Sequence, residues 1–207
     1  TTLSSDNAQS EPSTCKVVES FLFGGYKEQQ QPAMTVLKKG LALDSDTNAS
    51  IKSRGDSPLF TRPRGMLLHG PSGTGKSLLA RSLCKAANVA VEVLSHGVLL
   101  TLYVGDVEKR LAKTFSEARR RSPCVVLIED ADILCRSRSH ANSTSMHKSV
   151  VSSLLTLIDG LHAKTNVENG DNGADIFVLA TSARPQDIDR AMRRPGRLDA
   201  EIELTAP

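Results

Sequence analysis

The chain contains 207 residues, of which 39% are apolar and only 3% aromatic, and its formal net charge at pH 7 is +3. This length suffices for one domain with a hydrophobic core, and the mild charge argues against a nucleic-acid-binding or membrane-surface protein. No apolar run approaches the length that a bilayer span needs, and the N-terminus lacks the hydrophobic region of a secretory signal. We therefore expect neither membrane insertion nor direct contact with nucleic acid.

Cysteine usage indicates a reducing compartment. Cys15, Cys84, Cys124 and Cys135 show no CxxC spacing, and most of them stand among apolar residues. Buried free cysteine is common, so we interpret them as reduced thiols in an intracellular protein. The scattered histidines form no plausible zinc set with them. We expect the protein in the cytoplasm, with the nucleus as the alternative.

The N-terminal part of the chain is polar. Residues 1–16 are rich in Ser, Thr, Asn and Gln, and we expect a disordered tail over 1–20 and one folded domain over 21–207. Residues 44–57 (DSDTNASIKSRGDS) are turn-rich and predict a loop. GMLLHG predicts a strand from Gly65, and GKSLLARSLCKAA predicts a helix. The residues expected on the inward face of that helix are Leu78, Leu79, Leu83 and Ala86.

Strands and helices then alternate. VAVEVLS (89–95) predicts a second strand, and VEKRLAKTFSEARRR (107–121) an amphipathic helix with Leu111, Phe115 and Ala118 inward. CVVLI predicts a third strand, MHKSVVSSLLTLIDG a helix that ends at Gly160, and residues 163–174 a loop. IFVLATS and EIELT predict the fourth and fifth strands. This alternation indicates an α/β fold with a parallel sheet that is covered on both faces.

A phosphate-binding loop is predicted between the first strand and the first helix. GPSGTGKS, Gly70–Ser77, matches G-x-x-x-x-G-K-[ST] in the strand–helix context that this motif requires. Glycines let backbone N–H groups point at phosphate oxygens, and the helix places its positive dipole end there. A Gly/Ser-rich linker is the alternative, which the flanking strand and helix disfavour. The predicted nucleotide-binding residues here are Pro71, Ser72, Gly73, Thr74, Gly75, Lys76, Ser77 and Leu78.

Acidic residues follow the third strand directly. In phosphoryl-transfer enzymes with such a loop, an acid at this place holds Mg²⁺ and a neighbouring group orients the attacking water. This assigns those two tasks to Glu129 and Asp130, with the Ser77 hydroxyl as another magnesium ligand. They could instead be strand-end acids without a function. Against that, Asp132 adds a third carboxylate, and acids so close together repel one another unless a cation is expected.

Four motifs together resemble an AAA+ ATPase over about Phe21 to Pro207. These are GPSGTGKS, LIEDAD, TLYVGDVEKRLAKTF and ATSARPQDIDRAMRRPGRLDAEIELTAP, in the order of that family. The pattern is most similar to the first ATPase domain of tandem proteins of the valosin-containing-protein type. ILCRSR and SVVSSLLTLIDGL are most similar to the branch that acts in ribosome maturation. The resemblance implies a P-loop three-layer sandwich with a five-stranded parallel sheet, ATP and Mg²⁺ as cofactors, a homo-hexameric ring and a polypeptide substrate.

The resemblance also assigns roles to single residues. Glu129 stands where the family has its magnesium-associated Asp, and Asp130 where it has the catalytic Glu that polarises water. Ser182 stands at a polar sensor that is normally Asn. Arg194 and Arg197 match the arginine fingers that reach the γ-phosphate of a neighbouring subunit, although a solvated basic loop is the alternative.

Three further segments carry implied roles. Phe23-Gly24-Gly25 resembles the segment that packs against adenine, which makes Gly24 and Gly25 candidate nucleotide-binding residues. Tyr103 and Val104 match the pore loop that grips a translocating polypeptide, with an ordinary surface aromatic as the alternative. Asp159-Gly160 matches the start of a segment that signals between subunits.

The sequence departs from the family at the step of water attack. The acids come in the order Glu129–Asp130 instead of Asp–Glu, so the base would lie roughly 1–1.5 Å further from the water. Misplacement on this scale can lower the rate about a hundredfold. Ser182 also lacks the reach and the donor count of Asn. We hypothesise a domain that binds ATP well and hydrolyses it slowly.

Two other functions compete with an ATP-driven remodelling enzyme. One is a regulatory module that keeps its ATP and stabilises a ring, and the other is a DNA- or RNA-acting ATPase, which the low charge and the lack of aromatic platforms disfavour. The chain stops at LTAP, before the helical lid with which the family continues. We expect an excised piece without the lid, which alone is monomeric and nearly inactive because arginine fingers act across a subunit interface.

Overall fold

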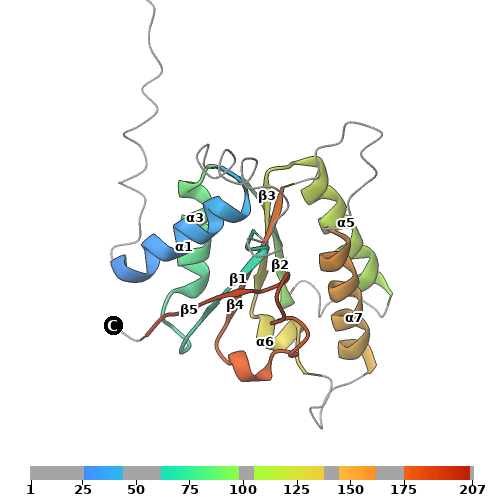
Figure 1. The fold of residues 1–207 in the computed structure, drawn as a ribbon. Helices are drawn as coiled ribbons and strands as arrows, with labels where there is room; N and C mark the ends of the chain where they lie inside the picture. The colour runs from blue at the N-terminus through green and yellow to red at the C-terminus, as the bar shows by residue number, and fades with distance from the viewer. Residues whose placement is uncertain (1–25, 44–61, 98–104, 138–144, 162–174, 206–207) are drawn as a thin grey trace, which may run out of the picture.

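The computed structural model describes residues 26–43, 62–97, 105–137, 145–161 and 175–205 (Figure 1). In these ranges, five strands form one sheet in the order β2-β3-β4-β1-β5, and all neighbouring strands are parallel. The strands are β1 (Gly65–His69), β2 (Ala90–Ser95), β3 (Cys124–Glu129), β4 (Ile176–Ser182) and β5 (Ala200–Glu203). The expected α/β fold with a five-stranded parallel sheet is therefore confirmed.

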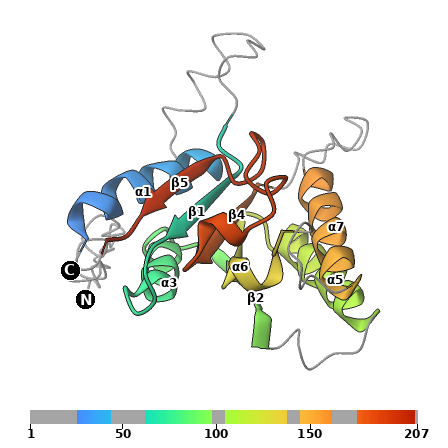
Figure 2. The same ribbon diagram turned by 90° about the horizontal axis from the view of Figure 1, so that it is seen from below.

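Helices cover both faces of the sheet, which produces three layers (Figures 1 and 2). On one face lie α1 (Lys27–Gly40) and α3 (Lys76–Ala86), and on the other lie α5 (Asp106–Arg120) and α7 (Ser145–Gly160). Two short elements, α6 (Ala131–Leu134) and the 3₁₀ helix η3 (Pro185–Asp187), follow β3 and β4. Every residue of β4 is buried, as a central strand that is covered on both faces requires.

Helix α1 was not predicted from the sequence. Pro32 lies inside it, and its mostly polar sequence KEQQQPAMTVLKKG hides the helical period. The apolar contacts nevertheless recur at helical spacing, since Ala33, Leu37 and Leu41 are almost completely buried in the same cluster as Leu68 and Phe177. Packing against the sheet thus supports the helix and offsets the cost of Pro32.

One predicted inward face is partly wrong. Leu79 and Leu83 of α3 are buried as expected, but the side chain of Leu78 is 54% exposed. Ala80 and Cys84 occupy the remaining buried positions of that face. The helix is therefore rotated relative to the expected face, so that Leu78 points away from the sheet. On α5, by contrast, the predicted inward residues Leu111, Phe115 and Ala118 are all buried.

Three of the four cysteines lie in the described ranges, and all three are free thiols. Burial raises the pKa of Cys84 and of Cys135 to about 12 and that of Cys124 to about 11. These thiols stay protonated near neutral pH, which agrees with their interpretation as reduced, inert core residues. Cys15 lies outside the described residues.

Among the described residues, no helix combines the length and the apolar character that crossing a membrane requires.

The structure predicts that the core depends on Phe177. Its side chain is fully buried in β4, so Phe177→Ala should lower the free energy of unfolding by about 3–5 kcal/mol. Leu43 is 37% exposed, so Leu43→Ala should change this free energy by no more than about 0.5 kcal/mol. Urea denaturation followed by circular dichroism measures both values. Equal effects of the two substitutions would contradict the assigned core.

Candidate nucleotide-binding site

Candidate residues gather at one edge of the sheet, where strands β1, β3 and β4 end. Gly70 follows β1, Glu129 ends β3, and Ser182 ends β4 between them. The register places His69 beside Ser182, and the Gly70 N–H donates to the Ser182 carbonyl oxygen at 3.3 Å. Ligands of parallel α/β sheets bind at this edge, and the topology thus brings the predicted loop and the predicted acids together.

The loop after β1 has a backbone that requires glycine at its first position. Gly70 has φ 152°, and a Cβ atom there would lie 2.1 Å from the carbonyl oxygen of Leu204. The Leu204 N–H also donates to the His69 carbonyl oxygen at 2.7 Å. Strand β1 therefore turns at Gly70 directly against the end of the β5 segment, and the loop then leads into α3, whose N-cap residue is Gly75.

The ammonium group of Lys76 lies in the middle of this loop. Its side chain is almost buried, and Nζ donates to the carbonyl oxygens of Gly70 at 2.8 Å and Pro71 at 2.6 Å. Burial lowers the pKa of Lys76, while the negative charges of Asp130 and Asp132 act in the opposite direction. A cation held by neutral carbonyl groups at the positive end of α3 is suited to bind an anion such as a phosphate group.

The remaining loop residues surround this cation with different exposure. Pro71, Ser72 and Gly73 are exposed, Thr74 is buried, and Ser77 is half-buried at the start of α3. The Thr74 hydroxyl donates to the Pro71 carbonyl oxygen at 2.9 Å and so fixes the loop internally. The loop is thus exposed to solvent at residues 71–73, whereas hydrogen bonds within the loop close its other side.

The two predicted catalytic acids point to different partners. The Glu129 carboxylate accepts hydrogen bonds from Arg81 of α3, from Nε at 3.0 Å and from Nη2 at 2.8 Å. The Asp130 carboxylate lies 3.1 Å from Nδ1 of His96, which follows β2. Asp130 has φ 52°, a left-handed conformation that aspartate tolerates at a moderate cost. This backbone turn separates the side chains of two adjacent residues.

Ser182 is fully buried, and its hydroxyl group already forms hydrogen bonds within the protein. It donates to Oδ1 of Asp132 at 3.2 Å and accepts from the backbone N–H of Arg184 at 3.1 Å. Asp132 is also buried, so this hydrogen bond satisfies a carboxylate that water scarcely reaches. Ser182 therefore lies at the predicted edge, but its side chain contacts an acid of α6.

The oxygen groups at this edge suit Mg²⁺. Ser77 supplies a hydroxyl and Glu129 a carboxylate that is mostly buried, and Mg²⁺ prefers such hard ligands. In the described ranges, no group of three or more His, Cys, Asp or Glu side chains is arranged to hold a metal. Mg²⁺ is commonly bound through one or two protein groups, with the remaining ligands from phosphates and water. Ser77 and Glu129 are the residues that would hold it.

Arg194 and Arg197 lie on the segment before β5 and differ strongly. The Arg197 guanidinium donates from Nε and Nη2 to the two carboxylate oxygens of Asp159, at 2.8 and 2.7 Å, and from Nη1 to the Ala191 carbonyl oxygen. The hydrogen bonds to Asp159 raise the pKa of Arg197. Arg194 is exposed to solvent. Two arginines that look equivalent in the sequence therefore have different environments.

Other predicted residues lie outside the described ranges, namely Gly24, Gly25, Tyr103 and Val104.

Sequence reasoning missed Arg81 and His96. His96 directly follows the predicted second strand, and the tips of parallel strands meet at one edge, so its position carried a usable signal. Arg81 lies within a helix whose sequence shows no motif beyond the loop, and its contact with Glu129 depends on how α3 is rotated over the sheet.

Comparisons with known proteins show the family of the chain. The family described as "ATPase family associated with various cellular activities (AAA)" matches residues 66–206. The ATPase family gene 2 protein of Saccharomyces cerevisiae is 34% identical over 83% of this chain and 20% of its own length. The cell division cycle protein 48 homolog of Archaeoglobus fulgidus is 36% identical over 70% of this chain and 18% of its own. The ATPase histone chaperone YTA7 of S. cerevisiae is 35% identical over 72% and 10%, respectively. The chain thus spans about a fifth or less of these relatives.

The geometry predicts that Lys76 dominates phosphate binding. Removal of a charged hydrogen-bond donor from the loop should weaken binding of a fluorescent adenosine diphosphate by about 10- to 100-fold. Lys76→Met is the test, and Lys113→Met on α5 is the control, since that lysine pairs with Glu117 at the surface. Fluorescence titration gives both affinities, and circular dichroism checks the fold. Wild-type affinity in folded Lys76→Met would refute the assignment.

Proposed function

Because the chain belongs to the AAA family of ATPases, we propose that it binds ATP with Mg²⁺ and hydrolyses ATP to remodel or unfold protein complexes. The observation that carries this proposal is the buried ammonium group of Lys76, which is held inside the loop and faced by the charges of Asp130 and Asp132. Bound Mg²⁺ would neutralise charge that develops on the phosphate oxygens. The chain contributes the cradle for the phosphates and carboxylates at the strand edge.

The proposed roles follow the positions of the side chains. Ser77 and Glu129 hold Mg²⁺, and Asp130 orients the attacking water, in the division that the family resemblance implies. Ser182 is the proposed sensor, although its hydroxyl group has to leave Asp132 before it can contact a bound group. Gly24 and Gly25 are proposed to approach the adenine.

The proposed assembly is a homo-hexameric ring that acts on a polypeptide. Arg194 is the better candidate for the finger that acts on the nucleotide of a neighbouring subunit, since it is exposed to solvent. Arg197 has to exchange Asp159 for a phosphate group before it can do the same. Tyr103 and Val104 are proposed to grip the polypeptide in the pore.

The cellular role proposed here is protein-complex remodelling in the cytoplasm or the nucleus, in ribosome biogenesis. The segments ILCRSR and SVVSSLLTLIDGL, which resemble the branch of the family that acts in ribosome maturation, support this choice. The relative named as a histone chaperone supports chaperone-like remodelling more generally. We propose that the folded unit spans residues 21–207 after a tail over 1–20, as the first ATPase domain of a tandem protein.

A hydrolysis-impaired module that stabilises the ring is the second candidate, and specific contacts favour it. Arg81 donates hydrogen bonds to the Glu129 carboxylate, and Nδ1 of His96 lies next to the Asp130 carboxylate. The Ser182 hydroxyl donates to Asp132. Glu129, Asp130 and Ser182 therefore lie against other protein groups, in addition to the reversed order of the acids. None of these contacts involves the hydrogen bonds that hold Lys76 in the loop.

The two candidates differ in the rate of a single turnover. If hydrolysis is impaired by the reversed acids, the double exchange Glu129→Asp with Asp130→Glu in the assembled full-length protein should raise that rate about a hundredfold. The affinity for ATP should change only slightly, because the loop is unchanged. Rapid-quench measurement of one bound equivalent of radiolabelled ATP gives the rate, and Asp106→Glu at the start of α5 is the matched control.

A wild-type rate that already equals the rate of the exchanged variant would exclude the hydrolysis-impaired candidate and support the remodelling ATPase. Absence of hydrolysis from the wild type and the variant alike would contradict the proposed catalytic roles of both acids.

A further inference from the structure

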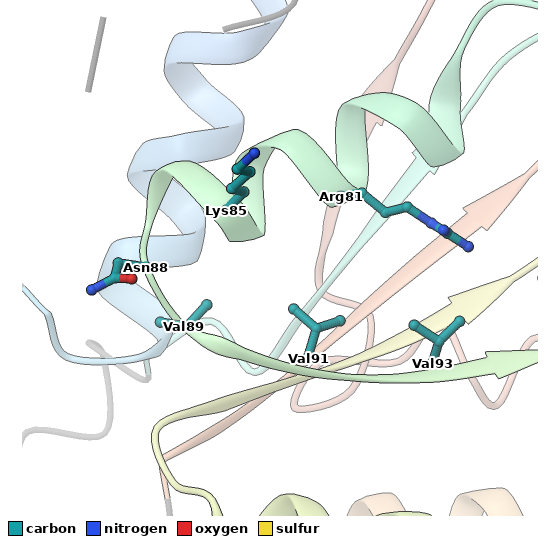
Figure 3. A pocket seen from close by; sticks show the side chains of 6 residues that line it. All are labelled: Arg81, Lys85, Asn88, Val89, Val91 and Val93. Carbon is teal, nitrogen blue, oxygen red and sulfur yellow. The ribbon is translucent and has the colours of Figure 1, made fainter. Parts of the chain in front are cut away.

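A groove of about 370 Å³ lies between α3 and the edge strand β2, away from the phosphate loop (Figure 3). Its volume falls in the range of ligand-binding pockets. Val91 and Val93 project from β2 towards α3 and line one side of the groove. Arg81 and Lys85, on successive turns of α3, line the other side. The full lining consists of Arg81, Lys85, Asn88, Val89, Val91 and Val93.

The groove exists because one face of β2 is only partly covered. Helix α5 packs against β2 and buries Leu94, whereas α3 packs against β1, β3 and β4. On the α3 side, Val93 therefore remains 40% exposed, and Val89 and Val91 are only half-buried. A row of apolar side chains next to an open helix face is a surface that a partner can cover.

In the part of the chain that the structure describes, the backbone of β2 is also unpaired along its outer side. Among the described strands, β2 pairs only with β3, so its other edge presents N–H and C=O groups to any further strand. An added strand would place every second side chain on the α3 side, beside Val91 and Val93. Strand addition of this kind is a common mode of peptide recognition.

The positive charges beside the groove indicate which residue types the added strand should carry. Arg81 and Lys85 are exposed cations that stand above the valines. A ligand whose side chains on the α3 side, at every second position, are in turn acidic and small apolar would place carboxylates beside the cations and cover the valines at the same time. We propose that this groove binds an extended, acidic and apolar segment of a partner protein, which adds to the free edge of β2.

Arg81 connects this groove with the nucleotide site. The same guanidinium that lines the groove donates both of its described hydrogen bonds to Oε1 of Glu129. A carboxylate in the groove competes with Glu129 for Arg81, and occupancy therefore changes the environment of the residue proposed to hold Mg²⁺. This connection rests on the proposed function, whereas the docking of the segment does not.

The test is an NMR titration of the ¹⁵N-labelled 207-residue chain. The probe is the octapeptide Glu-Ser-Val-Ser-Glu-Ser-Val-Ser, which carries Glu and Val on the same face of a strand. The control is its counterpart with Lys in place of Glu. With peptide up to about 1 mM, a range in which weak complexes are detected, the acidic peptide should shift amide signals of β2 and α3. The basic peptide should bind at least tenfold more weakly.

Two variants locate the binding. Lys85→Glu replaces an exposed cation and should weaken the acidic peptide about tenfold while strengthening the basic one. Val93→Asp should abolish binding of the acidic peptide, and Leu43→Asp is the matched control at an exposed leucine elsewhere. If Val93→Asp does not fold, the charge reversal at Lys85 still decides the question.

Equal affinity for both peptides, or shifts confined to other elements, would overturn the docking proposal. Self-association of the chain through the groove without peptide would also overturn it, since the occupant would then be a second copy. The connection is supported if the acidic peptide shifts the amide signals of Glu129 and Asp130, and if Arg81→Met removes these shifts. Peptide binding with both amide signals unchanged would overturn the connection alone. Loss of nucleotide binding in a chain that still binds the peptide would count against the proposed function only.

Discussion

The candidate nucleotide-binding site depends on one buried cation, the ammonium group of Lys76, which the loop after β1 holds with its own carbonyl oxygens. This arrangement requires that β1 ends against the β5 segment, because Gly70 can turn there only without a Cβ atom. It also requires that α3 starts immediately after the loop, so that the helix directs its positive end to the same place. The parallel sheet and its covering helices bring these parts together, and they leave a site whose charge favours phosphate.

The carboxylates at this edge are contacted by side chains from other helices and strands. Arg81 on α3 donates hydrogen bonds to the carboxylate of Glu129, and the ring of His96 after β2 lies next to the carboxylate of Asp130. The left-handed backbone at Asp130 directs these two side chains to different sides. These contacts of the acids are distinct from the hydrogen bonds that hold Lys76 in the loop. Substitution of Arg81 or His96 can therefore change the surroundings of the acids without removing the hydrogen bonds of the loop.

Much of this organisation could be predicted from the sequence. Apolar runs and helical spacing gave the sheet and three of its covering helices, and the loop motif identified Lys76 in its strand–helix context. The helix around Pro32 was missed, because its few apolar residues show their period only when they pack against the sheet. The partners of Glu129 and Ser182 could not be predicted, since they depend on the rotation of α3 and on the short helix α6. Motifs identify the residue types of a site, whereas the contacts of each carboxylate follow from tertiary packing.

Isothermal titration calorimetry of the chain with ATP tests the central claim most directly, with and without Mg²⁺. If Lys76 and the strand-edge carboxylates form one site, ATP binds with one equivalent per chain, and Mg²⁺ strengthens this binding. Absence of ATP binding under both conditions, in a chain whose circular dichroism shows that it is folded, would contradict the assignment of the loop. Binding that Mg²⁺ leaves unchanged would contradict the magnesium role of Ser77 and Glu129.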